Sequence, residues 1–356
     1  MRSKLAALIA LATTLAVAAP AAATGKHVQL QFRGEATLPT GTTFEGTTVG
    51  GLSSITYDSL RGVYYTVSDD PGQFQPVRFY TVGLDVRDGR LTNGDVSFKD
   101  VTTLLAPDGR PYPYPPMSVD PEGLALTRDR RLILTSEGVP AGLIDPFVRR
   151  YSLDGEFLRS LPVPQAFLVT PDQSSGVRPN LGFESAGVTR NGRFLFTASE
   201  NALYQDGPAA TVANGSPARI LRYDLRTGRP DRQWFYETDP VAEPPVPPTA
   251  FSVNGVVELL PLGHDHLIAM ERSFSVGAPG TGNTIKLYDV RLSGKHSPAR
   301  KTLLLNLDDL GIALDNVEGL TFGPRLRDGR RSVVLVSDNN FAPSQFTQFL
   351  LFAVGR

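Results

Sequence analysis

Short apolar segments alternate with turn signals along this chain, and they recur as pairs. In each pair, an apolar segment is followed after a tight connection by a second one that ends in a carboxylate. Apolar runs of about four to eight residues bounded by Gly, Pro, Asn and Asp predict β-strands. The five pairs lie at residues 51–70, 122–138, 184–201, 254–273 and 318–340.

The regular spacing of the acidic ends indicates a repeat, because these ends lie 63 to 71 residues apart. A third strand-like segment follows each pair and carries an aromatic residue at a matching place. Radially repeated sheets of four strands are typical of a β-propeller, an all-β fold. The acidic ends are Asp69, Glu137, Glu200, Glu271 and Asp338. The aromatic residues are Tyr80, Tyr151, Tyr223, Tyr288 and Phe352.

A fourth strand-like segment follows the first four repeats, at 96–104, 156–163, 232–238 and 301–307. The fifth repeat lacks one, since the chain ends directly after its third segment. An additional apolar segment at 27–39 precedes the first repeat. We therefore predict five four-stranded blades closed by this N-terminal strand, which removes an exposed sheet edge. A sixth blade within a long connection is the alternative.

The antiparallel order of the first two strands predicts where the acids lie. The start of the first strand and the end of the second fall at the same edge of a sheet. Glu122, Glu184 and Glu318 open first strands, so they should meet the acidic ends at one face of the disc, near the central channel. The longer connections also fall on this face, where loops on a rigid scaffold commonly carry function.

Composition narrows the chemistry of such a face. The 356 residues contain 20% charged residues, with a net charge of −1, which argues against a nucleic-acid partner. The chain has no cysteine, so disulfides, thiolate metal sites and a cysteine nucleophile are excluded. No G-x-S-x-G nucleophile motif occurs, which disfavours an ordinary serine esterase.

The first 23 residues have the pattern of a secretory signal peptide. Arg2 and Lys4 precede an apolar run, and small residues at 21–23 form a cleavage site. No later stretch approaches the ~20 apolar residues of a membrane span. We expect a secreted or periplasmic protein with a single mature domain at 24–356, acting as a monomer without a membrane span after cleavage. An uncleaved anchor is the alternative for the leader.

A ring of carboxylates at a channel mouth must be protonated, paired with arginine or neutralised by metal. Hard oxygen ligands favour Ca²⁺, or another hard divalent cation such as Mg²⁺, over zinc or copper. The alternative for each acid is a local cap of the following turn. Arg272 either neutralises the ring or binds an anionic substrate. The predicted metal ligands are Asp69, Glu122, Glu137, Glu184, Glu200, Glu271, Glu318 and Asp338.

Several segments together resemble the phytase-like family, known as "esterase-like activity of phytase". They are GLSSITYD, DPEGLALT, FTASENAL, RILRYDLRTG, IAMERSF, DNVEGLTFGPRL and LVSDNNF, and the likeness extends over about residues 45–355. ESAG at 184–187 and NGVV at 254–257 depart from the EGLA pattern of the family. The resemblance implies a secreted or periplasmic β-propeller that hydrolyses phosphoesters with calcium.

These considerations predict a metal-dependent hydrolase that binds a small anionic or phosphorylated substrate. Glu184 or Glu122 would act as the base, and Arg272 would bind phosphate. Arg78 and Arg178 are further phosphate-binding candidates, for which an ordinary surface arginine is the alternative. Asn180 and Asn339 are candidate polar contacts to the substrate. A non-catalytic ligand-binding propeller and a lactonase-like metal hydrolase are the alternative functions.

Overall fold

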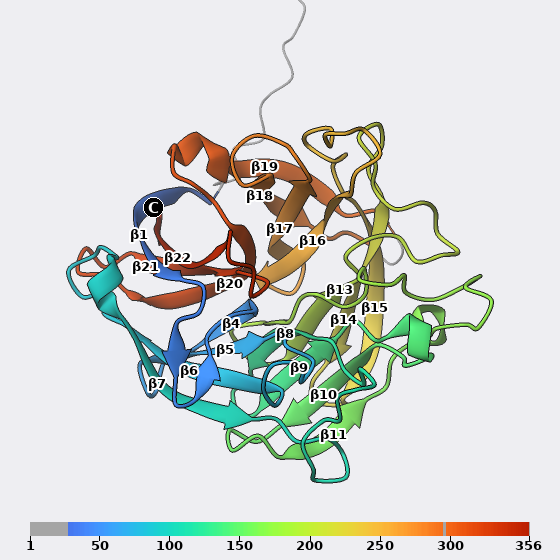
Figure 1. Cartoon of the computed structure of the whole chain (residues 1–356), viewed down its shortest axis with the longest axis horizontal. Helices are drawn as coiled ribbons and strands as arrows, with labels where there is room; N and C mark the ends of the chain where they lie inside the picture. Colours follow the sequence, from blue (N-terminus) through green and yellow to red (C-terminus); the bar gives the residue numbers. More distant parts are fainter. Residues whose placement is uncertain (1–27, 295–296, 356) are drawn as a thin grey trace, which may run out of the picture.

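The computed structural model describes residues 28–294 and 297–355, so the predicted leader at 1–23 lies outside the described residues. Five four-stranded antiparallel sheets are arranged as a ring (Figure 1). This is a five-bladed β-propeller, and it confirms the predicted fold class over the six-bladed alternative. Among the described residues, no helix is long and apolar enough to cross a membrane.

In blades 1 to 4, the strands follow one another along the chain from the first strand to the fourth. The fourth strands lie close to the predicted segments. Blade 1 contains β4 Leu52–Asp58, β5 Val63–Ser68, β6 Arg78–Leu84 and β7 Val96–Thr103. Blade 2 contains β8 Pro121–Leu126, β9 Leu132–Ser136, β10 Phe147–Tyr151 and β11 Phe157–Leu161. Blade 3 contains β12 Gly187–Val188, β13 Phe194–Ala198, β14 Pro217–Asp224 and β15 Arg229–Glu237.

Blade 5 is closed by the N-terminal strand, as predicted. β1 pairs with the last strand, β22, from Leu30 opposite Val354 to Pro39 opposite Phe346. Joining the two ends of the chain in one sheet leaves the ring without a break. Blade 4 contains β16 Ser252–Pro261, β17 His266–Ser275, β18 Asn283–Arg291 and β19 Arg300–Asn306. Blade 5 contains β20 Asn316–Arg325, β21 Arg331–Asp338, β22 Phe346–Val354 and β1 Leu30–Pro39.

The remaining elements are short and lie in the connections. A two-stranded hairpin follows β1, and four single turns of 3₁₀-helix occur between strands. These elements are β2 Thr43–Phe44, β3 Thr47–Thr48, η1 Asn93–Asp95, η2 Pro140–Gly142, η3 Gln165–Phe167 and η4 Leu307–Leu310.

The hydrophobic core consists of five clusters, and each lies between two neighbouring blades. The aromatic residues of the third strands are buried in them; Tyr80 and Phe352 are both fully buried. Burying one large aromatic side chain stabilises the folded state by about 2 to 3 kcal/mol. The recurring aromatic therefore fastens each sheet to its neighbour, which fixes the positions of the first strands around the channel.

A β-bulge recurs at the same place in the first strands of four blades. The register shifts at Ser53 in blade 1, between Pro121 and Leu124 in blade 2, at Val257 in blade 4 and at Glu318 in blade 5. A bulge leaves one residue out of the ladder and changes the direction of its side chain. In blades 2 and 5 the residue at the bulge is a glutamate, so the bulge positions an acid at the channel.

The first strand of blade 3 is irregular, because β12 has only two residues. The amide of Ala198 donates to Ser185 Oγ at 3.0 Å, and the amide of Ala186 donates to Glu258 Oε1 at 3.1 Å. Side-chain acceptors thus replace part of the strand ladder. Upstream, Phe183 still pairs with Ser199, which places Glu184 at the same point as the bulge glutamates.

Candidate functional site

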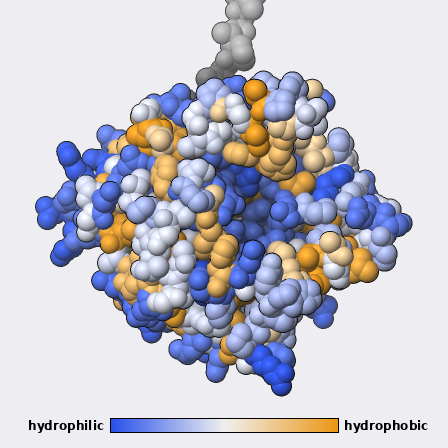
Figure 2. Space-filling view, in the orientation of Figure 1, coloured by the Kyte–Doolittle hydropathy of each residue, from blue (hydrophilic) through white to orange (hydrophobic). Residues whose placement is uncertain are grey.

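A polar cavity of about 380 Å³ lies at the channel mouth where first strands begin and second strands end. In the orientation of Figure 1, Figure 2 shows a hydrophilic hollow at the centre of the disc. All five blades contribute residues to the lining. Eight carboxylates line this cavity, those of Asp69, Asp120, Glu122, Glu137, Glu184, Glu200, Glu318 and Asp338. We call it the acidic cavity.

The second strands contribute one charged residue per blade to the acidic cavity. In blades 1, 2, 4 and 5, one residue of the second strand pairs with the residue just before the bulge of the first strand. The charged residue is the next one along the chain. In blade 5, Asp338 pairs with Asn316, and in blade 4 Arg272 pairs with Gly255 at the equivalent place. The five residues at this position are Asp69, Glu137, Glu200, Arg272 and Asp338.

The predicted ligand Glu271 does not line the cavity. It lies one residue before Arg272 on β17, and successive residues of a strand point to opposite faces of the sheet. Its carboxylate is buried and accepts hydrogen bonds from Tyr236 Oη at 2.7 Å and the Asp239 amide at 2.8 Å, and it pairs with Lys301 at 2.6 Å. Glu271 therefore fastens blade 4 to its neighbouring loop.

Arg272 is the only cationic side chain lining the acidic cavity among the residues that the structure describes. Its Nη2 donates to Glu318 Oε1 at 2.8 Å and lies 3.6 Å from Glu200 Oε1. Burial alone would lower the pKa of Arg272, but the charges of Glu318, Glu200 and Glu184 raise it. The guanidinium therefore stays charged and is oriented between carboxylates of two blades.

Two groups of carboxylates are close enough to hold a metal ion. Oxygens of Asp120, Glu122 and Glu137 lie within 4.8 Å of one another, and so do oxygens of Glu137, Glu184 and Glu200. Two ligands of one Ca²⁺ lie at most about 5 Å apart, because each Ca–O bond measures about 2.3 to 2.6 Å. The donor set is all oxygen and anionic, so the residues fit a hard divalent cation. Glu137 belongs to both groups.

Crowding of these acids changes their protonation. Burial, followed by repulsion from neighbouring carboxylates, raises the pKa of Glu122 and Glu184 well above its ordinary value. Burial also raises the pKa of Glu137 to about 8, with the charge of Asp120 adding to the effect. Without a cation, several acids are therefore protonated near neutral pH. A divalent cation would favour their ionised forms.

Three buried polar atoms at the cavity lack hydrogen-bond partners within the described part of the chain. They are Glu200 Oε1, Arg272 Nε and Asn283 Oδ1. Buried polar atoms are nearly always hydrogen-bonded, since leaving one unpaired costs about 1 to 3 kcal/mol. The three atoms belong to residues that line one cavity and include both donors and acceptors. This arrangement favours a bound ligand that carries both a cation and an anionic group.

Residues 47–341 match the family model "Phytase-like: Esterase-like activity of phytase". The chain belongs to this phytase-like family. A relative from Arthroderma benhamiae, described as "Uncharacterized secreted protein", is 23% identical over 265 residues, which cover 58% of this chain. The match spans about half of that relative, 52% of its length.

Solved structures with some likeness to the phytase-like chain include a luciferin-regenerating enzyme and a thermostable family-43 glycoside hydrolase. The first is 11% identical, with 86% of this chain and 93% of that chain covered and a TM-score of 0.39. The second is 12% identical, with 89% and 91% covered and a TM-score of 0.48. At these scores the likeness assigns no activity, and the propeller rests on the strand pairings of the phytase-like chain itself.

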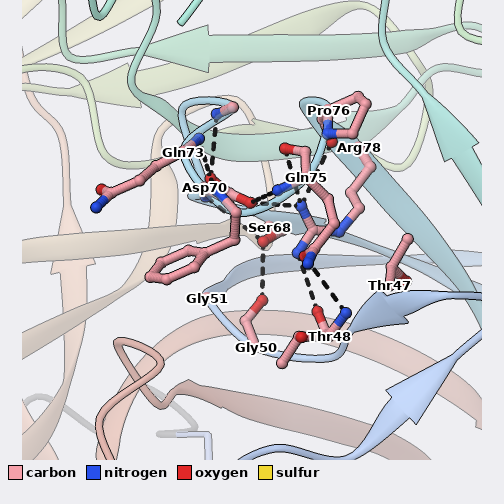
Figure 3. A network of polar contacts seen from close by, with 12 residues as sticks. Thr47, Thr48, Gly50, Gly51, Ser68, Asp70, Gln73, Gln75, Pro76 and Arg78 are labelled. Carbon is pink, nitrogen blue, oxygen red and sulfur yellow. Dashed lines mark hydrogen bonds and ion pairs between the residues drawn. The ribbon is translucent and has the colours of Figure 1, made fainter. Parts of the chain in front are cut away.

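Arg78, predicted as a phosphate-binding residue, does not reach the acidic cavity of the phytase-like chain. It is 1% exposed and forms a 2.7 Å ion pair with Asp70 (Figure 3). Its other donors bind the Thr48 carbonyl at 2.9 Å and Tyr80 Oη at 2.8 Å. Asp70 also accepts four backbone amides of the loop at 72–75. Arg78 and Asp70 thus hold this loop in place.

Two further residues that were predicted to contact the substrate form hydrogen bonds within the protein instead. Arg178 donates to the carbonyls of Ala202 at 3.0 Å and Gly207 at 2.7 Å, so it joins two loops. Asn339 is fully buried, and its Oδ1 accepts the amide of Gly51 at 3.1 Å. Neither lines the acidic cavity. The cavity is lined instead by Asn340, the next residue, and by the predicted Asn180.

The sequence reasoning missed two acids. Asp120 lines the cavity two residues before Glu122, where DPEG at 120–123 corresponds to NVEG at 316–319. Glu258 is buried one residue beyond the bulge of blade 4, and it accepts hydrogen bonds from Ser54 Oγ at 2.8 Å and the Ala186 amide. The sequence did indicate Glu258, because it is an acid within the apolar run VVELL at 256–260. Burial raises the pKa of Glu258 to about 8.

Proposed function

We propose that this protein is an exported, metal-dependent hydrolase that acts on phosphoesters, with Ca²⁺ as its cation. In this proposal, residues 24–356 form one secreted or periplasmic domain, consistent with the phytase-like family and the secreted relative. The observation that carries the proposal is the set of buried atoms that have no hydrogen-bond partner among the described residues, Glu200 Oε1, Arg272 Nε and Asn283 Oδ1, around a cavity rich in carboxylates.

One cation would be held either by Asp120, Glu122 and Glu137 or by Glu137, Glu184 and Glu200, and the glutamate of the other group would stay free as a base. When bound, such a cation supplies Lewis-acid polarisation of a phosphoryl oxygen and lowers the pKa of water. The protein would provide the remaining functions itself. The substrate must carry a compact anionic group, because the cavity of about 380 Å³ admits a small molecule and Arg272 lies in its wall.

Arg272 would bind a phosphoryl oxygen through Nε, the donor without a partner among the described residues. Its Nη2 stays bound to Glu318, so the guanidinium is already oriented before substrate arrives. A fixed donor stabilises developing charge better than a mobile one, and removing one such donor commonly costs 10²- to 10³-fold in turnover, as an order of magnitude.

Glu184 would accept the proton of the attacking water. Its carboxylate is 7% exposed and lies beside those of Glu137 and Glu200, facing the same cavity as Arg272. Glu122, the bulge residue of blade 2, is the second candidate for this role. A base must come within hydrogen-bond distance of the proton that it takes, and both residues face the acidic cavity.

The test combines metal analysis with a substrate panel. Purified protein should contain a divalent cation, and it should hydrolyse a phosphomonoester or phosphodiester in the presence of Ca²⁺ but not after chelation. Glu184→Gln should lose turnover while its thermal midpoint changes little. The matched control is Glu156→Gln, which makes the same change on an exposed residue outside the cavity and should keep full turnover.

Each other outcome replaces the proposal with a specific alternative. Cation binding without turnover of phosphoesters or lactones would identify a non-catalytic ligand-binding propeller. Turnover of lactones alone would identify a lactonase-like metal hydrolase. Unchanged phosphoester turnover in both Glu184→Gln and Glu122→Gln would contradict the assignment of the base.

A further inference from the structure

A second cavity, of about 730 Å³, lies at the other end of the channel. Its lining comes from the ends of the first strands and the turns that follow them, at 55–60, 125–128, 130, 186–190, 192, 259–261 and 320–325, and from Arg331 at the start of β21. On β20, Glu318 lines the acidic cavity and Arg325 lines the second one, which places the two roughly 20 Å apart at about 3.3 Å per residue. The two cavities are therefore separate.

The charge of the second cavity is opposite to that of the first. Five arginines line it and one acid, Asp58, accompanies them. Asp58 is already paired with Arg130 at 2.9 Å, and the other four arginines have no ion pair within the described part of the chain. We call this end the arginine mouth, formed by Arg128, Arg130, Arg190, Arg325 and Arg331.

Arg331 is the best oriented of these arginines. It is half-buried, and its guanidinium carbon lies 4.5 Å from the ring centroid of Phe322. Stacking on an aromatic face restricts a guanidinium and leaves its edge donors free. Burial lowers the pKa of Arg331, and the positive charges of Arg190 and Arg325 lower it further. An anion among these three arginines would relieve their repulsion.

The floor of the arginine mouth is apolar. Leu126, Val188 and Phe322 are half-buried there and keep part of their surface exposed, and Leu60 is 80% exposed at the rim. Purely inorganic anions gain nothing from such a floor, whereas an apolar group would be removed from water by it. A concave cavity also suits a small molecule better than a flat surface would.

We propose that the arginine mouth binds a small organic oxyanion, such as an organic phosphate or phosphonate. The charged head would lie among Arg190, Arg325 and Arg331, and the apolar body would lie on the floor, against Leu126 and Val188. This site does not depend on the function proposed for the acidic cavity, because it shares no residue with it.

Titration calorimetry of the whole protein with phenylphosphonate tests this site. The titration is carried out in chelator, so that no cation in the acidic cavity can bind the anion, and Glu184→Gln reports whether the ligand binds in that cavity. We expect one molecule bound per chain. Because charge-assisted hydrogen bonds to arginine are strong, Arg331→Gln should weaken binding about tenfold, and Arg190→Gln with Arg331→Gln should weaken it further.

Two controls make the test specific. Arg90→Gln removes the same charge from an exposed arginine outside the cavity and should bind like the unaltered protein. Inorganic phosphate should bind about tenfold more weakly than phenylphosphonate, because it has no apolar body. Thermal midpoints of all variants verify that they fold.

Three results would overturn the proposal. The first is absence of phenylphosphonate binding to the unaltered protein. The second is equal weakening in Arg90→Gln and Arg331→Gln, which would indicate non-specific attraction. The third is equal affinity for inorganic phosphate, which would refute the apolar part of the site. Loss of binding in Glu184→Gln would instead place the ligand in the acidic cavity and would also overturn the proposal.

Discussion

Blades 4 and 5 contribute opposite charges to the acidic cavity from equivalent positions. Blade 5 supplies Asp338 from its second strand and Glu318 from its bulge, whereas blade 4 supplies Arg272 from its second strand, and its bulge residue, Val257, is apolar and does not line the cavity. The sheets have the same strand order and the same bulge. One blade of the ring therefore places a positive charge among the carboxylates of the other blades.

The difference shows that the position within the repeat, more than the type of residue, decides which side chain reaches the cavity. A shift of one residue along β17 exchanges Glu271, which stabilises blade 4, for Arg272, which faces the cavity. In a strand, a one-residue shift moves a side chain to the opposite face. Predictions that separate these positions test the comparison most directly.

The largest predicted effect is on the pH dependence of stability. It arises because the acidic cavity has eight carboxylates and one arginine. Burial raises the pKa of Glu137 and Asp338 to about 8, and the pKa of Asp120 and Glu200 to about 7. In chelator, the folded state then binds more protons than the unfolded state between about pH 4 and 8, so stability should fall as pH rises through this window. One carboxylate kept protonated over three pH units corresponds to about 4 kcal/mol.

Thermal midpoints at pH 5, 6.5 and 8 measure this effect, in chelator and in Ca²⁺. We expect a steep decline in chelator and a nearly flat profile in Ca²⁺, because a bound cation favours the ionised carboxylates. A thermal midpoint that rises with pH in chelator would show that the pKa values of these carboxylates are not raised in the folded state.

The second prediction removes the charge that distinguishes blade 4. Arg272→Gln should lower phosphoester turnover by about 10²- to 10³-fold, because a fixed donor to the substrate is lost. It should also tighten Ca²⁺ binding, since a positive charge next to the carboxylates disappears. Arg272→Lys should restore part of the turnover. Weaker Ca²⁺ binding in Arg272→Gln would instead indicate that Arg272 only holds the ring of acids together.

The third prediction concerns the position directly after the bulge. Blade 5 has Gly319 there, where a Cβ would lie 2.6 Å from Val336 Cγ1, whereas blade 4 has Glu258. Glu258→Ala would leave Ser54 and the Ala186 amide without their acceptor, so the free energy of unfolding should fall by about 3 kcal/mol. Urea unfolding measures this, and Glu258→Gln, which keeps an acceptor, should lose less than about 1 kcal/mol. Equal loss in both variants would contradict the hydrogen-bond explanation.

Much of the fold could be predicted from the sequence because each repeat has recognisable features within short segments of the chain. Paired apolar runs, recurring aromatics such as Tyr80 and Phe352, and a missing fourth strand in the last repeat were sufficient for five blades and their closure by β1. These features depend on hydrophobic burial and strand pairing, which leave periodic patterns. The short β12 could not be predicted, because it depends on contacts to Glu258 of the neighbouring blade.

The site could be predicted only in part, because the register of the strands and the hydrogen-bond partners of the side chains depend on residues distant in sequence. When the repeats are aligned on their acids, Glu271 takes the position of Glu200. A serine precedes the acid in the other four blades, whereas a methionine precedes Glu271, and this difference indicated that Glu271 is out of register. The rest depends on partners distant in sequence. Nothing near Arg78 indicates that Asp70 and Thr48 occupy its donors, and nothing near Asn339 indicates its contact with Gly51.

The smallest predicted effect tests the register itself. Glu271→Gln keeps an acceptor for the Asp239 amide but replaces Oε1, so it loses the ion pair with Lys301 and the hydrogen bond accepted from Tyr236 Oη. It should lower the free energy of unfolding by about 1 kcal/mol and leave phosphoester turnover within about twofold. Glu200→Gln, the same substitution at the cavity-facing position of blade 3, should do the reverse, with turnover and Ca²⁺ affinity lowered about tenfold and stability maintained. If Glu271→Gln lost turnover as Glu200→Gln does, Glu271 would belong to the acidic cavity, and the one-residue distinction between blades 4 and 5 would be wrong.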